Sequence, residues 1–120
     1  MPPPFRPDAV IVHPRVDAAY RALEAAADEG RKPQQGIWKR FQAALARIRA
    51  EGQWGEVIPS GDIPAYFQDT YGVHNLYCID LAGDVRCFYT IEGHDVILLD
   101  IIDHDAYDDW FPPKGRRRRR

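Results

Sequence analysis

The chain has 120 residues, of which 45% are hydrophobic and 28% are charged, values typical of one globular domain with a single modest core. Its formal net charge is −2, but five of its 16 basic residues are Arg116 to Arg120, so the remaining 11 face 18 acidic residues and the rest of the chain carries −7. This acidic body counts against a nucleic-acid-binding protein, and the longest apolar run is too short to span a membrane.

The two ends of the chain differ in composition from its middle. Residues 1–7 are rich in proline and are expected to form a disordered lead, and residues 113–120 are expected to form a disordered basic tail. One domain is therefore predicted over residues 8–112. The opening Met-Pro-Pro-Pro lacks the basic and apolar regions of a signal peptide, so we expect a cytoplasmic protein.

The first half of the domain is predicted to be one strand followed by two helices. Residues 9–13 form a short run rich in β-branched residues, which Pro14 should end. Apolar residues at helical spacing predict one amphipathic helix over residues 16–30 and a second over residues 35–52. The short connection, which contains Gly30 and Pro33, favours an antiparallel helical hairpin.

The second half is predicted to be a loop and a three-stranded antiparallel meander. Residues 52–69 have no clear periodicity and are assigned to a loop. Strand-sized apolar runs follow at residues 72–81, 85–91 and 96–102, and glycine-containing turns separate them. A short C-terminal helix completes the chain. Helices on one face of an antiparallel sheet make an α+β fold.

The amino-acid sequence of the C-terminal third resembles the RelE/ParE superfamily of bacterial and archaeal type II toxins. The resemblance covers the chain in topology, and it rests on Ile63-Pro64, on Gly72-Val73-His74-Asn75-Leu76-Tyr77, on Val85-Arg86-Cys87-Phe88-Tyr89-Thr90-Ile91 and on Ile101-Ile102-Asp103-His104-Asp105-Ala106-Tyr107. The Arg-x-x-Tyr-Thr-Ile strand and the Asp-His-x-x-Tyr ending are its most specific parts. The spacing from Tyr89 to His104 is similar to that of the YoeB-like members.

The resemblance implies a small toxin that a cognate antitoxin neutralises. RelE-like members cleave mRNA at the ribosomal A site, whereas ParE-like members inhibit DNA gyrase. In the RelE-like branch a strand arginine contacts the scissile phosphate and a C-terminal histidine or tyrosine assists proton transfer. Arg86 matches the first position and His104 the second, and Tyr107 could serve where many members carry an aromatic residue beside the histidine. The glutamate of some members has no clear counterpart here.

The chemistry of these residue types suits RNA cleavage by the 2′-hydroxyl, which needs no metal ion and no cofactor. Arginine binds phosphate through two parallel hydrogen bonds, and histidine exchanges protons near neutral pH. Alternation along the strand should place Arg86 with Phe88 and Thr90 on a face that the helices leave open. Arg86 could instead pair with a carboxylate such as Asp80 or Asp100.

Structural roles compete with function at the other candidate residues. His104 could lie in a helix cap with Asp103, and Tyr107 could be a core residue. The exposed cations of the second predicted helix are a solvated face or an RNA-binding surface, and the candidates for RNA contact are Lys39, Arg40 and Arg47. Trp54 is interpreted as a core or helix-junction residue rather than as a base-stacking platform.

Two further kinds of site are considered. Cys78 and Cys87 would face each other across a hairpin if Ala82-Gly83 formed a two-residue turn, but free thiols are favoured. The aspartates around His104 are hard metal ligands without the spacing of a zinc site, so no metal site is predicted.

The predicted function is therefore that of a toxin acting as a metal-independent endoribonuclease on ribosome-bound mRNA. The alternative is a non-catalytic binding module on the same fold, either a gyrase inhibitor or a degenerate toxin. A basic concavity around Arg86 would favour the nuclease and an acidic one the binding module.

Overall fold

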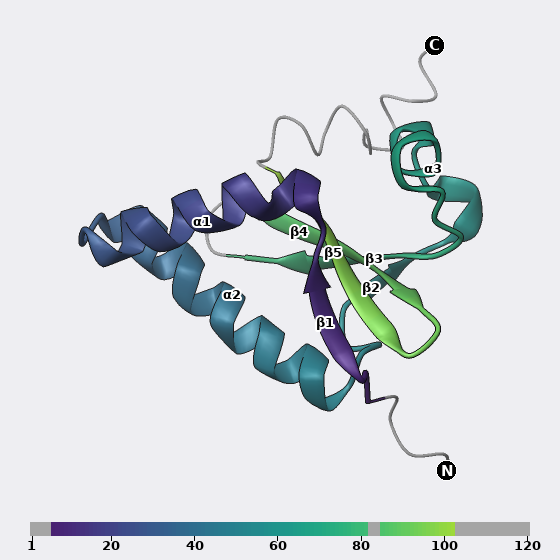
Figure 1. Cartoon of the computed structure of the whole chain (residues 1–120), viewed down its shortest axis with the longest axis horizontal. Helices are drawn as coiled ribbons and strands as arrows, with labels where there is room; N and C mark the ends of the chain where they lie inside the picture. The colour runs from purple at the N-terminus through teal and green to yellow at the C-terminus, as the bar shows by residue number, and fades with distance from the viewer. Residues whose placement is uncertain (1–5, 82–84, 103–120) are drawn as a thin grey trace, which may run out of the picture.

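The computed structural model describes residues 6–81 and 85–102, and these contain three α-helices and five β-strands. Figure 1 shows their arrangement. In chain order the elements are β1 (Ala9–Val12), α1 (Pro14–Asp28), α2 (Lys32–Ala50), β2 (Glu56–Ile58), the 3₁₀ turn η1 (Ser60–Asp62), α3 (Ala65–Tyr71), β3 (Leu76–Asp80), β4 (Arg86–Glu92) and β5 (Asp95–Ile102). None of the described helices is long and apolar enough to cross a membrane.

All five strands belong to one sheet with the order β1-β5-β4-β3-β2. β1 runs parallel to β5, and every other neighbouring pair is antiparallel. Glu92 of β4 pairs with Asp95 of β5, so only Gly93 and His94 form the turn between them. Gly93 has a φ of 61°, a left-handed conformation that suits glycine in a two-residue hairpin turn.

Apolar side chains are buried on both faces of this sheet. The α1–α2 hairpin covers one face and α3 covers the other (Figure 1). The buried cluster under the hairpin contains Val16, Phe41, Ala44, Leu45, Ile48, Ile79, Leu81, Cys87, Tyr89, Val96 and Leu98. The buried cluster under α3 contains Ile58, Ile63, Phe67, Leu76, Cys78, Phe88 and Leu99.

A shift in register within β5 decides where Asp100 points. Phe88 pairs with Asp100 and Tyr89 pairs with Leu98, so Leu99 is an extra residue in β5. Leu98 belongs to the cluster under the hairpin and Leu99 to the cluster under α3. Regular alternation would then return Asp100 to the apolar hairpin side, but its carboxylate bonds to tyrosines of α3. An extra residue of this kind re-aims side chains.

The coarse α+β class is confirmed, but the predicted arrangement of strands is wrong. The segment assigned to a loop contains β2, which extends the sheet, and α3, which covers the face predicted to be open. The predicted helix at 16–30 is α1, which already begins at Pro14 because proline is well tolerated at the first helical position. The predicted helix at 35–52 is α2, which begins at Lys32 and ends at Ala50. The predicted C-terminal helix lies outside the described residues.

The two cysteines lie on opposite faces of the sheet. Cys87 pairs with Ile79 across the β3–β4 ladder, and Cys78 pairs with Phe88. Both thiols are free and buried, and burial raises the pKa of Cys78 to about 12 and that of Cys87 above its usual value as well. The cross-strand pairing of the thiols, raised as one possibility by the sequence, is therefore wrong in this register.

Candidate functional site

Arg86 begins β4 at one end of the sheet. Its cross-strand neighbours are Asp80 of β3 and Ile102 of β5. Arg86, Phe88 and Thr90 alternate with the residues of the hairpin face as predicted, but their face is not open. Phe88 is fully buried in the cluster under α3, and Thr90 is almost fully buried and bonds to Asn75. Only Arg86, whose side chain is 23% exposed, reaches solvent at the strand's beginning.

The guanidinium of Arg86 forms an ion pair with the Asp80 carboxylate. This is one of the structural roles that the sequence left open, while Asp100 has other partners. The Asp80 side chain is 69% exposed, and solvent-exposed ion pairs contribute at most about 1 kcal/mol. The Arg86 side chain is only 23% exposed, so a phosphate group would have to approach the guanidinium from the exposed side of Asp80. The ion pair holds the Arg86 side chain in place, and it is compatible with either a structural or a phosphate-binding role.

His104 and Tyr107, the predicted proton-transfer residues, lie outside the described residues. So does most of the aspartate-rich run that was weighed as a metal site. Within residues 6–81 and 85–102, no three His, Cys, Asp or Glu side chains are grouped so that they could hold a metal ion.

The predicted RNA-binding residues lie on α2, and two of them border a groove. Lys39, Arg40 and Arg47 are all exposed. Arg40 and Arg47 line a groove of about 500 Å³ together with Trp54 and Asp80. The alanines of α2 form its floor, namely Ala43, Ala44 and Ala46. The groove therefore connects the cations of α2 with the carboxylate that pairs with Arg86.

Trp54 is more exposed than the sequence interpretation implied. Its residue is 37% exposed, and the guanidinium carbon of Arg47 lies 5.3 Å from the centroid of its ring, within the range of a cation–π contact. Trp54 also lines a second cavity of about 230 Å³. Its other lining residues are Gly55, Glu56, Cys78, Ile79 and Asp80. Trp54 and Asp80 therefore line both cavities, the larger of which also has two arginines and the smaller of which also has Glu56.

Tyr89 fixes the loop that carries Trp54. Its side chain is buried, its hydroxyl donates to the carbonyl of Gly52 at 2.8 Å, and it accepts a hydrogen bond from the amide of Gly55 at 2.8 Å. A Cβ at Gly55 would lie 2.7 Å from this hydroxyl, so only glycine fits there without a shift. Burial raises the pKa of Tyr89 to about 12. The two hydrogen bonds bracket Trp54 and hold it at the groove.

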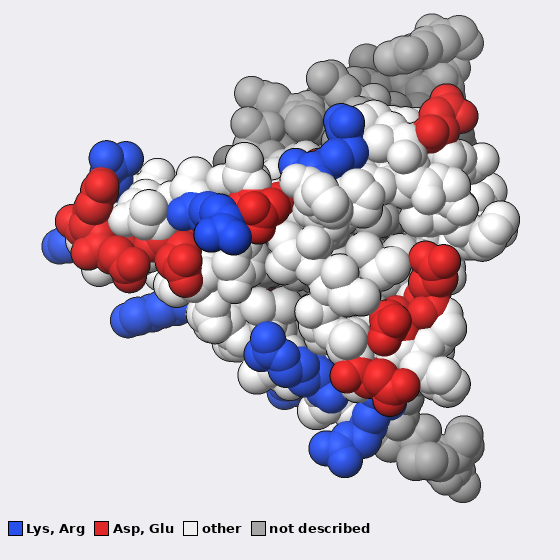
Figure 2. Space-filling model, viewed as in Figure 1, with Lys and Arg blue, Asp and Glu red and all other residues white. Residues whose placement is uncertain are grey.

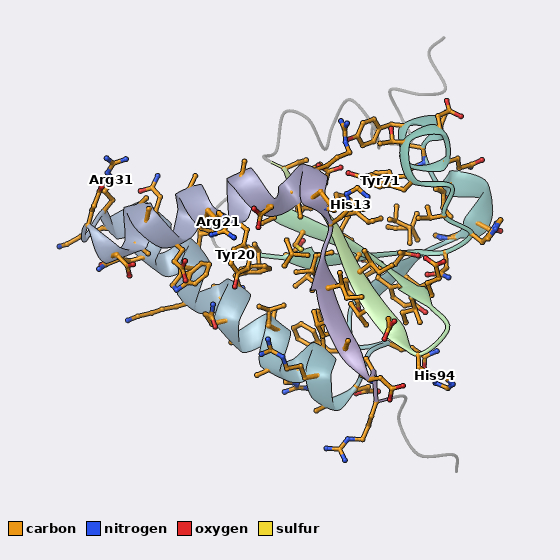
Figure 3. The ribbon with its side chains drawn as sticks, in the orientation of Figure 1. His13, Tyr20, Arg21, Arg31, Tyr71 and His94 are labelled. Atoms are coloured by element: carbon orange, nitrogen blue, oxygen red, sulfur yellow. The ribbon has the colours of Figure 1, made fainter. Side chains whose placement is uncertain are left out.

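A second polar cluster joins α3 to β5 and to the beginning of α1. The hydroxyls of Tyr66 and Tyr71 each donate to Oδ2 of Asp100 at 2.9 Å, and the Tyr71 hydroxyl also lies 2.8 Å from the Leu99 carbonyl. Arg15 contacts both hydroxyls, which raises the pKa of its guanidinium. Figure 3 shows His13 and Tyr71 turned toward one another, with ring centroids 4.7 Å apart.

This Tyr66–Tyr71–Asp100 cluster was not predicted. Asp100 is the one charged residue within the apolar run of β5, and this was the available signal. Burial and the hydrogen bonds to Tyr66 and Asp100 raise the pKa of Tyr71 above its ordinary value. Both tyrosine hydroxyls already donate to one oxygen of Asp100. The cluster therefore attaches α3 to β5, and its hydroxyl protons are not available to bind an anion.

Family models, curated proteins and solved structures were all compared with this chain, and none of them matches it. Any functional assignment therefore depends on the residues and geometry described above.

Proposed function

We propose that this protein is a RelE/ParE-like toxin that cleaves ribosome-bound mRNA without a metal ion and that a cognate antitoxin neutralises. The observation that carries the proposal is the register between Arg86 and Ile102 at the end of β5. His104 follows Ile102 by two residues, and two residues of chain span at most about 7 Å. We therefore expect the histidine of the resemblance to lie near the strand arginine.

The proposed reaction assigns one role to each of these groups. The 2′-hydroxyl of a nucleotide attacks the adjacent phosphorus, and the 5′-oxygen of the next nucleotide leaves. Arg86 exchanges Asp80 for the phosphate and stabilises the charge that develops on it. His104 donates a proton to the leaving 5′-oxygen, and the proton of the attacking 2′-hydroxyl passes to water with the help of Tyr107 as a second proton-transfer group. A positioned acid or base of this kind contributes about 10²–10⁴-fold to the rate.

The groove beside α2 supports an RNA substrate in spite of the acidic body. Arg40 and Arg47 line it, Lys39 lies on the same helix, and Asp80, the partner of Arg86, lines it as well. Local cations can hold a phosphate backbone by counterion release even on a protein of negative net charge. On the face shown in Figure 2, acidic and basic side chains are mixed on the α1–α2 hairpin, and further acidic side chains lie on the opposite side of the molecule.

The test is induction of the protein in bacterial cells, with growth and mRNA 5′ ends measured with and without translation. We expect growth arrest and new 5′ ends within codons that require ribosomes. Arg86→Gln and His104→Ala should each reduce cleavage at least about 100-fold. The control is Arg21→Gln, which breaks an exposed ion pair with Asp17 on α1 and should leave cleavage unchanged. Full toxicity of the His104→Ala variant would overturn the nuclease assignment.

A second candidate is a binding module without catalysis, such as a gyrase inhibitor or a degenerate toxin. The observation that favours it is the acidic surroundings of Arg86, since Asp80 pairs with it and Glu56 borders the adjacent cavity. Growth arrest without new mRNA ends, with supercoiling by gyrase inhibited, would identify the gyrase inhibitor. Absence of both effects would identify the degenerate form.

A further inference from the structure

Trp54 is held as a rigid, partly exposed aromatic surface between two cavities. Its neighbours Gly52 and Gly55 are fixed by the hydroxyl of Tyr89, which lies 34 residues away from Gly55 in sequence. Its own amide donates to the carbonyl of Glu51 at 3.1 Å, which closes a turn at the end of α2. An exposed tryptophan with this much backbone support is pre-organised, so a ligand that contacts it loses little freedom in ordering the loop.

The two cavities beside the indole differ in charge. The larger one is lined by two arginines, Arg40 and Arg47, and by one acidic residue, Asp80, which also lines the smaller one. The smaller one carries the carboxylates of Glu56 and Asp80 on walls that also include buried Cys78 and Ile79. A ligand that fills both must present negative charge to the first and hydrogen-bond donors to the second, with a flat group for the indole.

We propose that Trp54 is the stacking platform for one base of single-stranded RNA, with adjacent phosphates on Arg40 and Arg47. The base occupies the smaller cavity, and its amino group donates to Glu56 or Asp80. This inference rests on the proposed function, since it names how the same groove holds the RNA. Aromatic rings and a positive groove are the two features that proteins use to bind single strands.

The carboxylates make the site selective for bases that carry an amino group. Adenine, cytosine and guanine each present an amino donor, which a carboxylate accepts. Uracil has a single N–H flanked by two carbonyl oxygens, and those oxygens face the carboxylates unfavourably. The protein is therefore expected to bind oligo(A) and oligo(C) more tightly than oligo(U).

The test measures binding of the full-length protein to fluorescent oligonucleotides of about eight residues, a typical site size for such grooves. The oligomers are 2′-O-methyl oligo(A), oligo(C) and oligo(U), which lack the nucleophilic hydroxyl and so cannot be cleaved. Trp54→Leu should weaken binding of oligo(A) and oligo(C) about 5- to 150-fold, the range for loss of one stacked base. Glu56→Gln should reduce the preference over oligo(U).

The arginines provide a matched pair of charge variants. Arg47→Gln should weaken binding of all three oligomers equally and lower the salt-dependence slope by about 0.7. Arg49→Gln removes the same charge from an exposed position on α2 that lines neither cavity, and it should leave both quantities unchanged. Circular dichroism of each variant establishes that the fold is retained.

The outcomes separate this inference from the proposed function. Unchanged affinity of Trp54→Leu for every oligomer would overturn the stacking site, even if the parent cleaves mRNA in cells. If Trp54→Leu binds the oligomers more weakly but the parent does not cleave mRNA, the stacking site is supported and the nuclease assignment is wrong. Equal affinity of the parent for oligo(U) and oligo(C) would overturn the role of the carboxylates.

Discussion

The two faces of the sheet are closed by different means. Under the α1–α2 hairpin, two long amphipathic helices bury a cluster of apolar residues, and Tyr89 is its polar exception. On the other face, α3 has only seven residues, and its tyrosines bond to Asp100 while Thr90 bonds to Asn75. A helix this short is not stable alone in water. The first face therefore folds by periodic burial, whereas the second depends on individual contacts.

The difference matters for the candidate site, because the Arg86 face is the one that α3 covers. On this face Phe88 and Thr90 are buried, and Arg86 at the beginning of β4 is partly exposed. Variants on the two faces can establish whether they form one cooperative unit and how much each kind of contact contributes.

The largest effect is expected from Phe67→Ala on α3. Phe67 is fully buried, and its ring lies 5.0 Å from that of Phe88 between centroids. Loss of a buried phenylalanine costs about 3–5 kcal/mol in the free energy of unfolding. Urea denaturation should show this loss, and Phe41→Ala, which truncates a fully buried ring under the hairpin, should show a similar one. A loss below about 1 kcal/mol for Phe67→Ala alone would mean that α3 is not part of the cooperative core.

The next largest effect is expected from Tyr89→Phe. The substitution leaves the carbonyl of Gly52 and the amide of Gly55 without their partner, and an unsatisfied buried group costs about 1–3 kcal/mol. The control is Tyr77→Phe, whose ring stacks on Tyr89 at 5.1 Å and whose hydroxyl makes no hydrogen bond among the described residues. Denaturation should separate the two variants by at least 1 kcal/mol. Equal stabilities would show that the Trp54 loop does not need the hydroxyl.

The same contrast between periodic and individual contacts explains what the sequence could predict. Apolar residues at a period of 3.6 predicted α1 and α2, and apolar runs between glycine-containing turns indicated β3, β4 and β5. β2 has only three residues, and α3 begins after Pro64 and ends at Tyr71, just before Gly72, which has a φ of 66°. The composition of residues 59–64, with two prolines and a glycine, indicated a loop, and a seven-residue helix is too short for its period to be recognised.

The site was predicted in part for a related reason. Arg86 could be assigned to one face by strand alternation, and Asp80 was among its expected partners. The orientation of Asp100 depends on the extra residue Leu99 in β5, and alternation alone gives the wrong face. The exposure of Trp54 depends on the Tyr89 hydroxyl. Contacts of this kind join positions that are far apart in sequence, so they cannot be predicted from a local sequence pattern.

A third prediction uses one tyrosine from each face, Tyr71 and Tyr89. The pKa of each is raised from 10.0, that of Tyr89 to about 12. Above about pH 10 the unfolded chain therefore loses protons that the folded protein keeps, so the free energy of unfolding falls as pH rises. Each tyrosine contributes a slope of up to about 1.4 kcal/mol per pH unit. Urea denaturation at alkaline pH should show a shallower fall in Tyr71→Phe and in Tyr89→Phe than in the parent, with both cysteines retained in all three. Identical slopes would show that the tyrosine hydroxyls ionise equally easily in both states.

The smallest effect is expected from Asp80→Asn, and it bears most directly on function. The proposed phosphate role requires that Arg86 can leave Asp80, so the pair should contribute less than about 1 kcal/mol to stability. Added salt should reduce the difference between variant and parent, since the carboxylate is largely exposed. Asp17→Asn, which breaks the exposed 2.8 Å pair with Arg21 on α1, should behave in the same salt-dependent way. A loss above about 2 kcal/mol in Asp80→Asn, insensitive to salt, would mean that the guanidinium depends on its carboxylate as a buried ion does. The ion pair of Arg86 would then be one of the contacts that stabilise the α3 face of the sheet. A phosphate that replaced Asp80 would lower the free energy of unfolding.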